Sequence, residues 1–558
     1  MRVATQATML TADPVADEIL ADLRAIVGGG HVVADDVGRS LHSRTTETET
    51  RRCGAVVRPG SAQEVAAILR LATKRGVAVW PFSCGNNWGY GTKNAIDPGA
   101  VIMVLERMNR IVEVNADLAY AVIEPGVTQQ QLYEHLRDNH PQLMADCTDS
   151  SPLGSVLGNA IERGYGYTPY GDHFGHLCGL EVVTPAGELL RTGGAADGCP
   201  TWNTHKWGSG PALEGLFSQG NFGVVVKGGI WLHPRPEKLL LFTLDVHDTD
   251  ELAEAVNGLR GLALSGTLRS HVHTANAFQT LSLVQQYPPD LLAKGSRIPP
   301  ERLDRMTAAL GVSAWTAVGG LYGSAAQVRA ARSELVRVLR GKGSLAFFDE
   351  AKVAQSQRMV DLWRRSGGRG ASATIAKAVK WAVTRKDFAL VELLPEMYGV
   401  LLGRPTWSVL RSAYLKSPLQ PATRDLDPAR DGCGLMWLAT AVPMTGEQAR
   451  TVLALAEPLF TAFDFNMSAC LTMMNERTLF FLLGIFFKLD NDVERERAGK
   501  LYGALHRTFT DHGYQQYRGG VPEWTVGDAG GDTGRRLLGQ LKQVLDPGAV
   551  LAPGRYRI

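Results

Sequence analysis

The chain has 558 residues, 45% of them hydrophobic and 20% charged, so it has enough apolar residues for a large core and enough length for more than one domain. Its 58 basic and 56 acidic residues leave a formal net charge of +2, which excludes the strongly basic surface typical of proteins that bind nucleic acid or anionic membranes. The seven cysteines are scattered and form no CxxC pair, which argues against a disulfide framework and a zinc site.

The amino-terminal residues carry a single arginine and are interrupted by threonines and an aspartate, which is not the pattern of a secretory signal. No run approaches the ~20 apolar residues that span a bilayer, and the nearest candidate, residues 479–487, has the length of a strand. We therefore expect a soluble cytoplasmic protein. Its reduced cysteines are expected to pack as small apolar residues, with Cys84 set apart because it lies in a glycine-rich motif.

Residues 60–135 alternate between helical and extended periods, the pattern of an α/β layer. A capping box at residues 61–64 opens a helix that Gly76 ends, and a second helix is predicted over residues 128–137. Apolar runs between and after these helices predict strands. The predicted strands cover residues 77–82, 101–105, 111–114, 120–124, 180–184 and 224–232.

Two prolines within residues 233–236 can continue neither a helix nor a central strand, so we place a domain boundary there. Beyond it, a strand followed by a helix recurs, which predicts a sheet covered on one face by helices and built from two similar halves. The strands are predicted over residues 239–246, 315–322, 435–443 and 479–487, and the helices that follow them begin at residues 250, 325, 446 and 492. Sequence self-similarity is too weak for a true repeat.

Two segments are unusually rich in glycine. The first, residues 80–92, directly follows a predicted strand, and successive backbone N–H groups in such a loop can cradle a pyrophosphate. The second, residues 153–173, holds more glycine and tyrosine than a packed core element tolerates. Tight turns alone would also explain either loop, but neither GxGxxG nor GxxxxGK[ST] occurs, which disfavours a nicotinamide Rossmann fold and a P-loop. Together the segments predict a large, flat, phosphate-bearing ligand.

A series of short motifs, in fixed order, resembles the flavin domain of vanillyl-alcohol oxidase, eugenol oxidase and 4-cresol dehydrogenase. The matching residues are 58–61, 80–81, 89–91, 124–127, 158–159, 162–164, 166–173, 206–208, 221–223, 517–518, 546–547 and 552–554. The match is dense over residues 55–236 and sparse near the end of the chain. The order and spacing of so many motifs are specific to this branch of the flavin fold.

The resemblance implies an α+β protein in which a two-subdomain FAD-binding fold, the PCMH type, is covered by an α/β cap. An N-terminal helical segment (1–54) would precede the FAD-binding domain (55–236) and a substrate-binding cap (237–500). The C-terminal segment (501–558) would complete the FAD domain and the active site. A homo-oligomer, dimeric or higher, is expected from the same resemblance.

The resemblance also assigns the FAD site, mostly to neutral backbone that can hold two phosphates. The loop over residues 83–91 would wrap the pyrophosphate, residues 125–126 would lie along the flavin and residues 223–224 would lie near the adenosine. The residues expected to contact FAD are Ser83, Cys84, Gly85, Asn86, Asn87, Gly89, Gly91, Pro125, Gly126, Ser150, Gly154, Ser155, Gly158, Asn159, Gly164, Gly166, Gly223 and Val224.

Tyr90, Tyr517 and Arg518 match the phenolate clamp of the family, and Tyr167 matches its tyrosine beside the substrate ring. A phenol with a pKa near 10 is a poor electron donor, whereas its phenolate makes hydride loss from the para α-carbon to flavin N5 feasible. Two hydroxyls and a guanidinium converging on one oxygen favour that ionised form. The resulting quinone methide would add water to give an alcohol or lose a proton to give an alkene. Taken singly, these residues also fit a turn tyrosine and a surface pair.

The chain departs from the family where some members bond covalently to the flavin. Leu435 stands at the position of the cap histidine of vanillyl-alcohol oxidase, and there is no histidine between His273 and His506. The 4-cresol enzyme uses a cap tyrosine, but Tyr398 and Tyr414, the nearest candidates, lie at unconvincing spacing. The pyrophosphate loop also lacks the histidine that berberine-bridge-type enzymes use. We therefore expect FAD that is bound without a covalent link.

The acid-base position is also altered, because the active-site aspartate of vanillyl-alcohol oxidase falls on Ser150, with Asp149 adjacent. A hydroxyl cannot do the acid-base work of a carboxylate, and residues 474–480 lack the histidines that would activate a water molecule. Addition of water to the quinone methide is therefore in doubt, and desaturation or alcohol oxidation is favoured. His271 and His273 share one side of a predicted strand, but a pair without a third ligand is more often structural than metal-binding. No metal is expected.

Other functions stay open. One alternative is a flavin oxidase of the same fold that acts on a non-phenolic alcohol, and the intact clamp argues against it. Another is a redox module without its own substrate, and the cap of about 260 residues argues against that. The electron acceptor is either oxygen or an electron-carrier protein. The expected substrate is a small para-substituted phenol.

Overall fold

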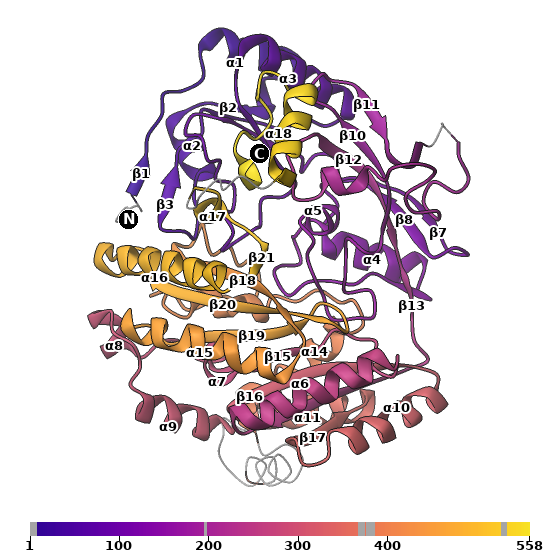
Figure 1. The fold of residues 1–558 in the computed structure, drawn as a ribbon, viewed down its shortest axis with the longest axis vertical. Coiled ribbons are helices and arrows are strands. Elements are labelled where there is room, and N and C mark those ends of the chain that lie inside the picture. The colour runs from indigo at the N-terminus through magenta and orange to yellow at the C-terminus, as the bar shows by residue number, and fades with distance from the viewer. Residues whose placement is uncertain (1–7, 195–197, 366–373, 375–385, 526–532) are drawn as a thin grey trace.

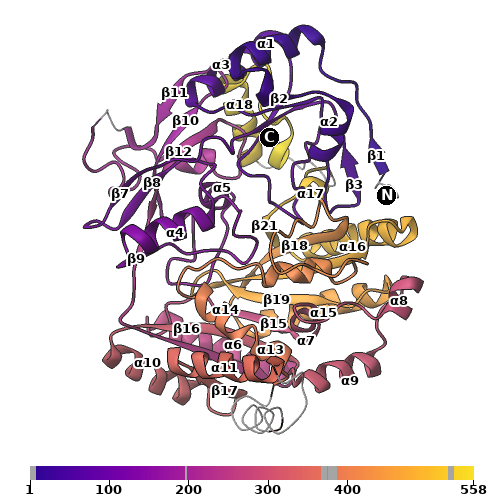
Figure 2. The same cartoon turned by 180° about the vertical axis from the view of Figure 1, so that it is seen from behind.

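The computed structural model describes residues 8–194, 198–365, 374, 386–525 and 533–558. Figures 1 and 2 show two halves stacked along the long axis of the molecule. The upper half holds the first part of the chain together with its last helix, and the lower half holds one large sheet with its helices. Among the described helices, none combines the length and the apolar character that a bilayer span requires.

The first sheet of the upper half is mostly parallel. Its strands, in spatial order, are β2 (Val32–Val33), β4 (Ala55–Val57), β6 (Val101–Val104) and β5 (Val79–Phe82). Helices α1 (Asp17–Val27) and α3 (Ala62–Arg75) pack against each other beside it. The predicted α3 is confirmed, with Ser61 as its N-cap and Gly76 in the left-handed conformation at its end. Only half of the predicted capping box forms, because the Glu64 carboxylate accepts the N–H of Gly60 instead of that of Ser61.

The second sheet of the upper half is antiparallel. Its strands, in spatial order, are β11 (Leu189–Arg191), β10 (Leu177–Val183), β12 (Val224–Trp231), β8 (Tyr120–Ile123) and β7 (Ile111–Asn115). Its hydrophobic core includes residues of α4 (Gln129–Asn139) and α5 (Val156–Ile161), and α18 (Thr533–Leu545) packs against that core. The prediction of one α/β layer over residues 60–135 is therefore corrected: β5 and β6 belong to the first sheet, whereas β8 pairs with β12 and β7 pairs with β8 in the second sheet.

The lower half is built on one antiparallel eight-stranded sheet. Its strands, in spatial order, are β17 (Ser344–Phe348), β14 (Lys238–Val246), β16 (Trp315–Gly323), β15 (His273–Asn276), β19 (Ser468–Met473), β20 (Thr478–Lys488), β18 (Cys433–Pro443) and β21 (Gln515–Arg518). We call this sheet with its helices the cap. The chain enters the cap after β13 (His233–Pro234), which pairs with β9 (Leu143–Met144).

One face of the cap sheet is covered by helices, as predicted. They are α6 (Thr249–Leu264), α10 (Ala325–Val338), α15 (Gly446–Ala462) and α16 (Asp492–Asp511). Alternate strand residues such as Phe242 and Leu244 are buried against them in the largest hydrophobic core. Because successive strand residues point to opposite faces, the residues between them face the upper half.

Shorter elements complete the fold. In the upper half these are β1 (Thr8–Leu10), which pairs with β3 (Glu49–Arg51), and α2 (Asp36–His42). The cap adds α7 (Ala277–Ser282), α8 (Pro289–Lys294), α9 (Pro300–Leu310), α11 (Glu350–Arg365), α13 (Phe388–Val391), α14 (Leu394–Val400) and the 3-10 helix η4 (Val409–Tyr414). Helix α17 (Val521–Thr525) follows β21 on the return to the upper half.

Two of the predicted domain limits do not match these elements. The expected end of the cap at residue 500 falls inside α16, which packs on β18 and β20, and β21 then adds to the same sheet. We therefore place the end of the cap after Arg518. The segment 1–54, expected to be helical, contains α1 and α2 but also β1, β2 and β3.

Candidate active site

A cavity of about 540 Å³ lies between the two halves. Its wall comes from three parts of the chain: the loops after β5 and β9, the uncovered face of the cap sheet, and the C-terminal segment. A cavity of this size between two layers is the usual place for a cofactor and its substrate.

The first glycine-rich loop forms one side of the cavity. Ser83, Gly85, Asn86 and Asn87 line it, and Gly85 has a φ of +71°, a conformation that glycine adopts without strain. The Asn86 side chain donates to the backbone carbonyl of Leu153 (3.0 Å), which ties this loop to the second one.

The second loop lies against the first at the start of α5. Ser155 caps this helix, accepting the N–H of Gly158 (2.8 Å) and donating to the carbonyl of Pro125 (2.6 Å). A Cβ added at Gly158 would lie 2.1 Å from Ser83 Oγ, so only glycine permits this approach of the two loops. The result is a backbone-lined cradle of the kind that holds phosphate groups.

Several polar side-chain atoms in the cavity wall are buried and have no hydrogen-bond partner among the described residues. They are Trp80 Nε1, Asn221 Oδ1, Arg518 Nε, Trp524 Nε1 and Arg555 Nε. Buried polar groups are nearly always paired in folded proteins, so these donors and the acceptor indicate a polar ligand. A dinucleotide with phosphate, ribose and ring nitrogen and oxygen atoms fits the four of these atoms that lie outside Arg518, and the residues present therefore fit FAD.

Most of the predicted site residues meet at this cavity. Those that line it are Ser83, Gly85, Asn86, Asn87, Tyr90, Pro125, Ser150, Gly154, Ser155, Gly158, Asn159, Gly164, Tyr167, Gly223, Val224, Tyr517 and Arg518. They come from segments separated by more than 400 residues, and the fold brings them to one place.

The remaining predicted contacts, Cys84, Gly89, Gly91, Gly126 and Gly166, are not among the residues that line the described cavity, and their contact with FAD stays a prediction. Cys84 faces the carbonyl of Gly126, and burial raises the pKa of its thiol to about 12. A Cβ on Gly89 would collide with the ring of a cap tryptophan, and one on Gly126 with backbone oxygens. Gly91 and Gly166 likewise have close neighbours. These residues support the wall by close packing.

The predicted clamp forms at the β21 end of the cavity. The Arg518 guanidinium lies 4.8 Å from the centre of the Tyr90 ring, and its Nη2 donates to Asn87 Oδ1 (2.6 Å). Burial raises the pKa of both Tyr90 and Tyr517, and the positive charge of Arg518 opposes this rise. Both tyrosines are therefore neutral hydrogen-bond donors at neutral pH, while Arg518 carries the charge.

A second cluster of polar side chains lines the cavity, and of its members only Tyr167 was predicted to lie in the active site. The Asp149 carboxylate accepts the Tyr167 hydroxyl (2.8 Å), and the Tyr167 ring stacks on His273 with centroids 3.8 Å apart. All three line the cavity. The family's aspartate position falls on Ser150, and in this structure the adjacent Asp149 places a carboxylate in the cavity wall. Burial lowers the pKa of His273, so its ring is neutral near pH 7.

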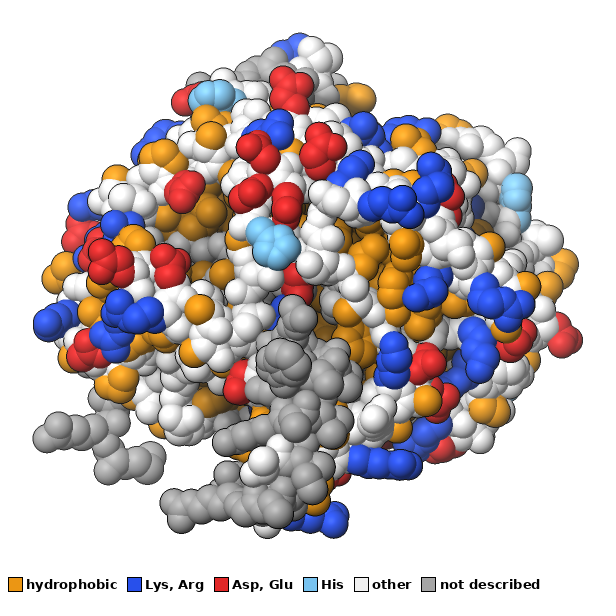
Figure 3. Space-filling model, turned by 90° about the horizontal axis from the view of Figure 1, so that it is seen from below, with side chains coloured by type: hydrophobic (Ala, Val, Ile, Leu, Met, Phe, Trp, Pro, Cys, Tyr) orange, Lys and Arg blue, Asp and Glu red, His pale blue; other side chains and the backbone are white. Residues whose placement is uncertain are grey.

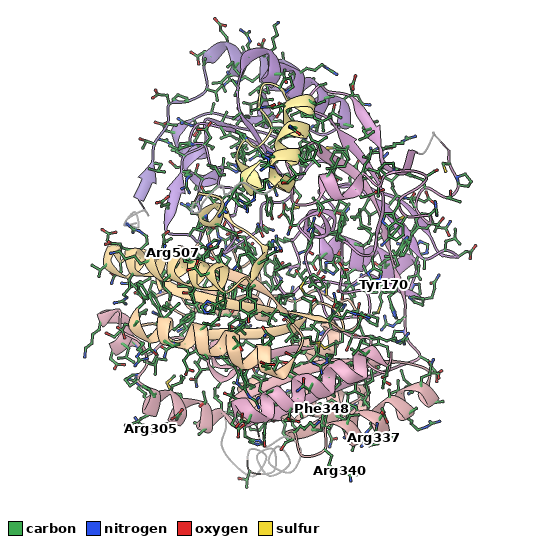
Figure 4. All side chains as sticks on the ribbon, viewed as in Figure 1. Tyr170, Arg305, Arg337, Arg340, Phe348 and Arg507 are labelled. Carbon is green, nitrogen blue, oxygen red and sulfur yellow. The ribbon has the colours of Figure 1, made fainter. Side chains whose placement is uncertain are left out.

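Two further tyrosines of the second glycine-rich loop lie in different surroundings. Tyr165 lines the cavity and packs edge-on against Tyr517, with ring centroids 6.1 Å apart. Tyr170, labelled in Figure 4, stacks on His176 and lies outside the described cavity wall. A glycine-rich loop carries no periodicity from which the direction of either side chain could be read.

The histidine pair considered for metal binding is held by protein groups. His271 Nδ1 contacts the carbonyl of Met473 (2.8 Å), while His273 contacts Thr472 Oγ1 and the carbonyl of Gly166 (3.2 Å each). Among the described residues, no three histidine, cysteine or carboxylate side chains gather as a metal site.

The candidate residues for a covalent flavin bond point elsewhere. Tyr398 donates to the carbonyl of Leu239 (3.3 Å) and Tyr414 to Asp431 (2.5 Å), and neither is part of the described cavity wall. Leu435, at the position of the family's cap histidine, does line the cavity but has no atom that could form such a bond.

Comparison with known proteins identifies the family. A family model described as an FAD binding domain matches residues 54–193. The 1'-carboxy-chondrochloren decarboxylase of Chondromyces crocatus is 34% identical over 542 residues, covering 97% of each chain. The flavoprotein subunit of 4-cresol dehydrogenase (hydroxylating) from Pseudomonas putida is 27% identical over 542 residues, covering 96% of this chain and 94% of that subunit. The chain belongs to the vanillyl-alcohol oxidase and 4-cresol dehydrogenase family.

Solved structures of this family share the fold over nearly the whole chain. The 4-ethylphenol oxidase from Gulosibacter chungangensis superposes with a TM-score of 0.84 at 26% identity, covering 98% of this chain and 99% of that one. Substrate-bound p-cresol methylhydroxylase gives 0.83 at 25% identity, covering 97% and 96%. As a member of this family, the protein is an FAD-dependent oxidoreductase with an α+β fold.

Proposed function

We propose that the protein oxidises a para-substituted phenol by removing hydride from the carbon attached to the para position. The clamp carries this proposal: Arg518 Nε is buried without a partner among the described residues, beside Tyr90 and Tyr517. A phenolate oxygen is the acceptor that this site lacks. The names of the relatives, a p-cresol methylhydroxylase and a 4-ethylphenol oxidase, support the same substrate class.

The charged and the neutral residues of the clamp have different roles. Arg518 favours the phenolate over the phenol, and Tyr90 and Tyr517, whose pKa values are raised, donate hydrogen bonds to the same oxygen. The ionised oxygen pushes electron density to the para carbon, which makes loss of hydride easier. Bound FAD supplies the two-electron acceptor for that hydride. The substrate becomes a neutral quinone methide.

Asp149 is the group that would act on this quinone methide. Its carboxylate lines the cavity and is held by the Tyr167 hydroxyl, so it can take a proton within the site. If the proton comes from water, oxygen adds to the α-carbon and an alcohol forms. If it comes from the next carbon of the chain, an alkene forms. In both cases the electrons return to the ring and restore the phenolate.

The test compares a para-alkylphenol with its O-methyl ether. We expect 4-ethylphenol to reduce the bound flavin and the ether to leave it oxidised, because the ether has no ionisable oxygen for the clamp. Flavin absorbance after rapid mixing without oxygen measures both rates. Equal reduction by the two compounds would instead favour a non-phenolic substrate.

Variants of Arg518 connect this result to the clamp. Arg518→Leu should retain FAD but slow reduction by 4-ethylphenol roughly a hundredfold or more, because a charge-assisted hydrogen bond in a closed site contributes about 2–4 kcal/mol. Arg518→Lys should recover part of the rate, since an ammonium lacks the planar fork of a guanidinium. A flavin-replete Leu variant with a rate within about twofold of wild type would remove Arg518 from the mechanism.

Oxidative decarboxylation is a second candidate, because the relative that is 34% identical over 97% of both chains is named as a decarboxylase. A carboxylate on the carbon next to the quinone methide carbon can leave as CO₂. The electrons of the broken C–C bond then form the alkene and restore the phenolate. The same clamp and the same hydride loss serve this reaction.

The compound 3-(4-hydroxyphenyl)propanoate distinguishes the two outcomes. Decarboxylation predicts 4-vinylphenol and CO₂ in equal amounts, both matching the flavin reduced in a single turnover. A product that keeps its carboxyl group, such as the alcohol or 4-coumarate, would exclude decarboxylation and leave phenol oxidation in place. Mass spectrometry of the quenched mixture measures all of these products.

A further inference from the structure

The cavity extends well beyond the clamp, along the uncovered face of the cap sheet. A row of paired residues crosses five neighbouring strands there, each facing the cavity: Asp245, Thr316, Ala275, Cys470 and Leu482. Since strands lie about 4.8 Å apart, the row is about 19 Å long. A phenol with one or two para carbons is much shorter than this floor.

A second row runs beside the first and begins next to the clamp. Phe480 stacks on Tyr517 with ring centroids 4.7 Å apart, and the row continues through Thr472, His273 and Val318 to Thr243. The pairing is in register throughout these strands, so the two rows form a continuous track leading away from Arg518.

Short helices and edge strands of the cap line the far end of the track. Leu390 of α13, with Leu394 and Met397 of α14, lines the cavity there together with Thr243 of β14 and Phe348 of β17. Phe348 is labelled in Figure 4, in the lower half. We call this far part, between β14, β16, β17 and the two short helices, the cap channel.

Polar side chains in the channel are paired with one another. Asp245 accepts the Thr316 hydroxyl (2.9 Å) on one oxygen and forms an ion pair with Lys386 (2.7 Å) on the other. Nearer the clamp, His273 contacts Thr472 (3.2 Å). The surface left for a ligand is therefore largely apolar, since these groups already have partners.

We propose that the substrate carries a long, mostly apolar para substituent that lies in the cap channel while its phenol is held at Arg518. This rests on the proposed phenol oxidation and specifies its substrate class. The register of the two rows gives the chain a path of about 19 Å, and the Asp245–Lys386 pair marks its far end. Figure 3 shows the lower face of the molecule, where hydrophobic side chains are visible between residues of both charges.

The test compares 4-ethylphenol with 4-heptylphenol. Each buried methylene should improve binding by up to about fourfold, so 4-heptylphenol should have a KM at least about tenfold lower. Thr243→Trp should fill the channel far from the clamp and remove this difference in KM between the two phenols. Lys238→Trp, which adds the same bulk on the exposed start of the same strand, should retain the difference.

Three outcomes would overturn the inference: no advantage for 4-heptylphenol in the wild type, equal losses for both phenols in Thr243→Trp, or the same loss in Lys238→Trp. If neither phenol reduced the flavin, the proposed function would fail instead. The channel would then be judged by binding of 4-heptylphenol, measured from the shift in melting temperature. We expect a shift in the wild type and in Lys238→Trp but none in Thr243→Trp.

Discussion

Glu47 is a fully buried carboxyl group beside the clamp. Neither of its oxygens has a hydrogen-bond partner among the described residues. A Cβ added at Gly520 would lie 3.2 Å from Glu47 Oε1 and 3.1 Å from the Tyr90 Cα, which places the carboxyl directly behind Tyr90. Burial raises the pKa of Glu47 from 4.5 to about 8, and the nearby Arg51 only partly opposes this.

This raised pKa predicts a specific dependence of stability on pH. Because the folded pKa lies above the unfolded one, the stability contributed by the protonated group is present below about pH 4.5 and is lost as the pH rises through 8. Glu47→Gln removes that loss. We expect the free energy of unfolding of this variant to exceed that of wild type by more at pH 8.5 than at pH 5.5, and the two excesses should differ on the order of a few kcal/mol. Denaturant unfolding at the two pH values measures it.

Glu49→Gln is the matched control, since Glu49 is exposed and lies two residues away. It should change the free energy of unfolding much less than Glu47→Gln does at pH 8.5, because its carboxylate is half exposed in its pair with Arg51. A Glu47→Gln variant that is less stable than wild type at pH 8.5 would contradict the prediction and indicate that the carboxylate is needed in its charged form.

Individual site residues were predictable from the sequence where a motif fixed them. The clamp residues Tyr90, from the first glycine-rich loop, and Tyr517 and Arg518, from the end of β21, meet at one cavity in the structure. Asp149 was named only as the neighbour of Ser150, since a loop has no period from which to read that its side chain points into the cavity. The unpartnered atoms Asn221 Oδ1 and Trp80 Nε1 were also missed, because only the folded cavity reveals that they lack partners among the described residues.

At the scale of elements, the sequence predicted strands and helices well where burial is one-sided or complete. The strands predicted before residue 233 all occur, with ends within three residues, and β14, β16, β18 and β20 occur within two. Strands β17, β19 and β21 of the cap were not predicted, and β15 was expected only as the strand that carries His271 and His273. β15, β17 and β21 are short and partly polar, and β19 lies next to a turn, so none has a clear apolar run.

Pairing between strands was the part that the sequence could not provide. β7 and β8 were expected in the layer of β5 and β6, yet they join a different sheet. Periodicity reports which face of a strand is buried but not which strand lies beside it. The cap channel depends on this pairing, because its track exists only when β14, β16 and β15 lie in register.

At the scale of the whole molecule, hydrogen bonds and an ion pair of the C-terminal segment hold the cavity wall in place. Lys542 of α18 donates to the carbonyls of Asn221 (2.7 Å) and Leu551 (2.8 Å) and pairs with Asp546. Asn221 in turn donates through Nδ2 to the carbonyl of Ala552 (3.1 Å). The Asn221 Oδ1 without a partner is therefore held rigidly toward the cavity, where a bound cofactor can use it.

The last prediction is that this cofactor is bound without a covalent link and stabilises both halves. Tyr398 and Tyr414 are engaged by other groups, and Leu435 cannot form a bond, so acid precipitation should release all FAD into the supernatant. The stripped protein should melt at a lower temperature, because unpartnered donors and backbone from both halves lose their ligand. Added FAD should restore stability in proportion to the logarithm of its concentration, by about 2.7 kcal/mol at a hundred times Kd. Flavin that stays in the denatured pellet would instead establish a covalent link, and mass spectrometry of its peptides would name the residue.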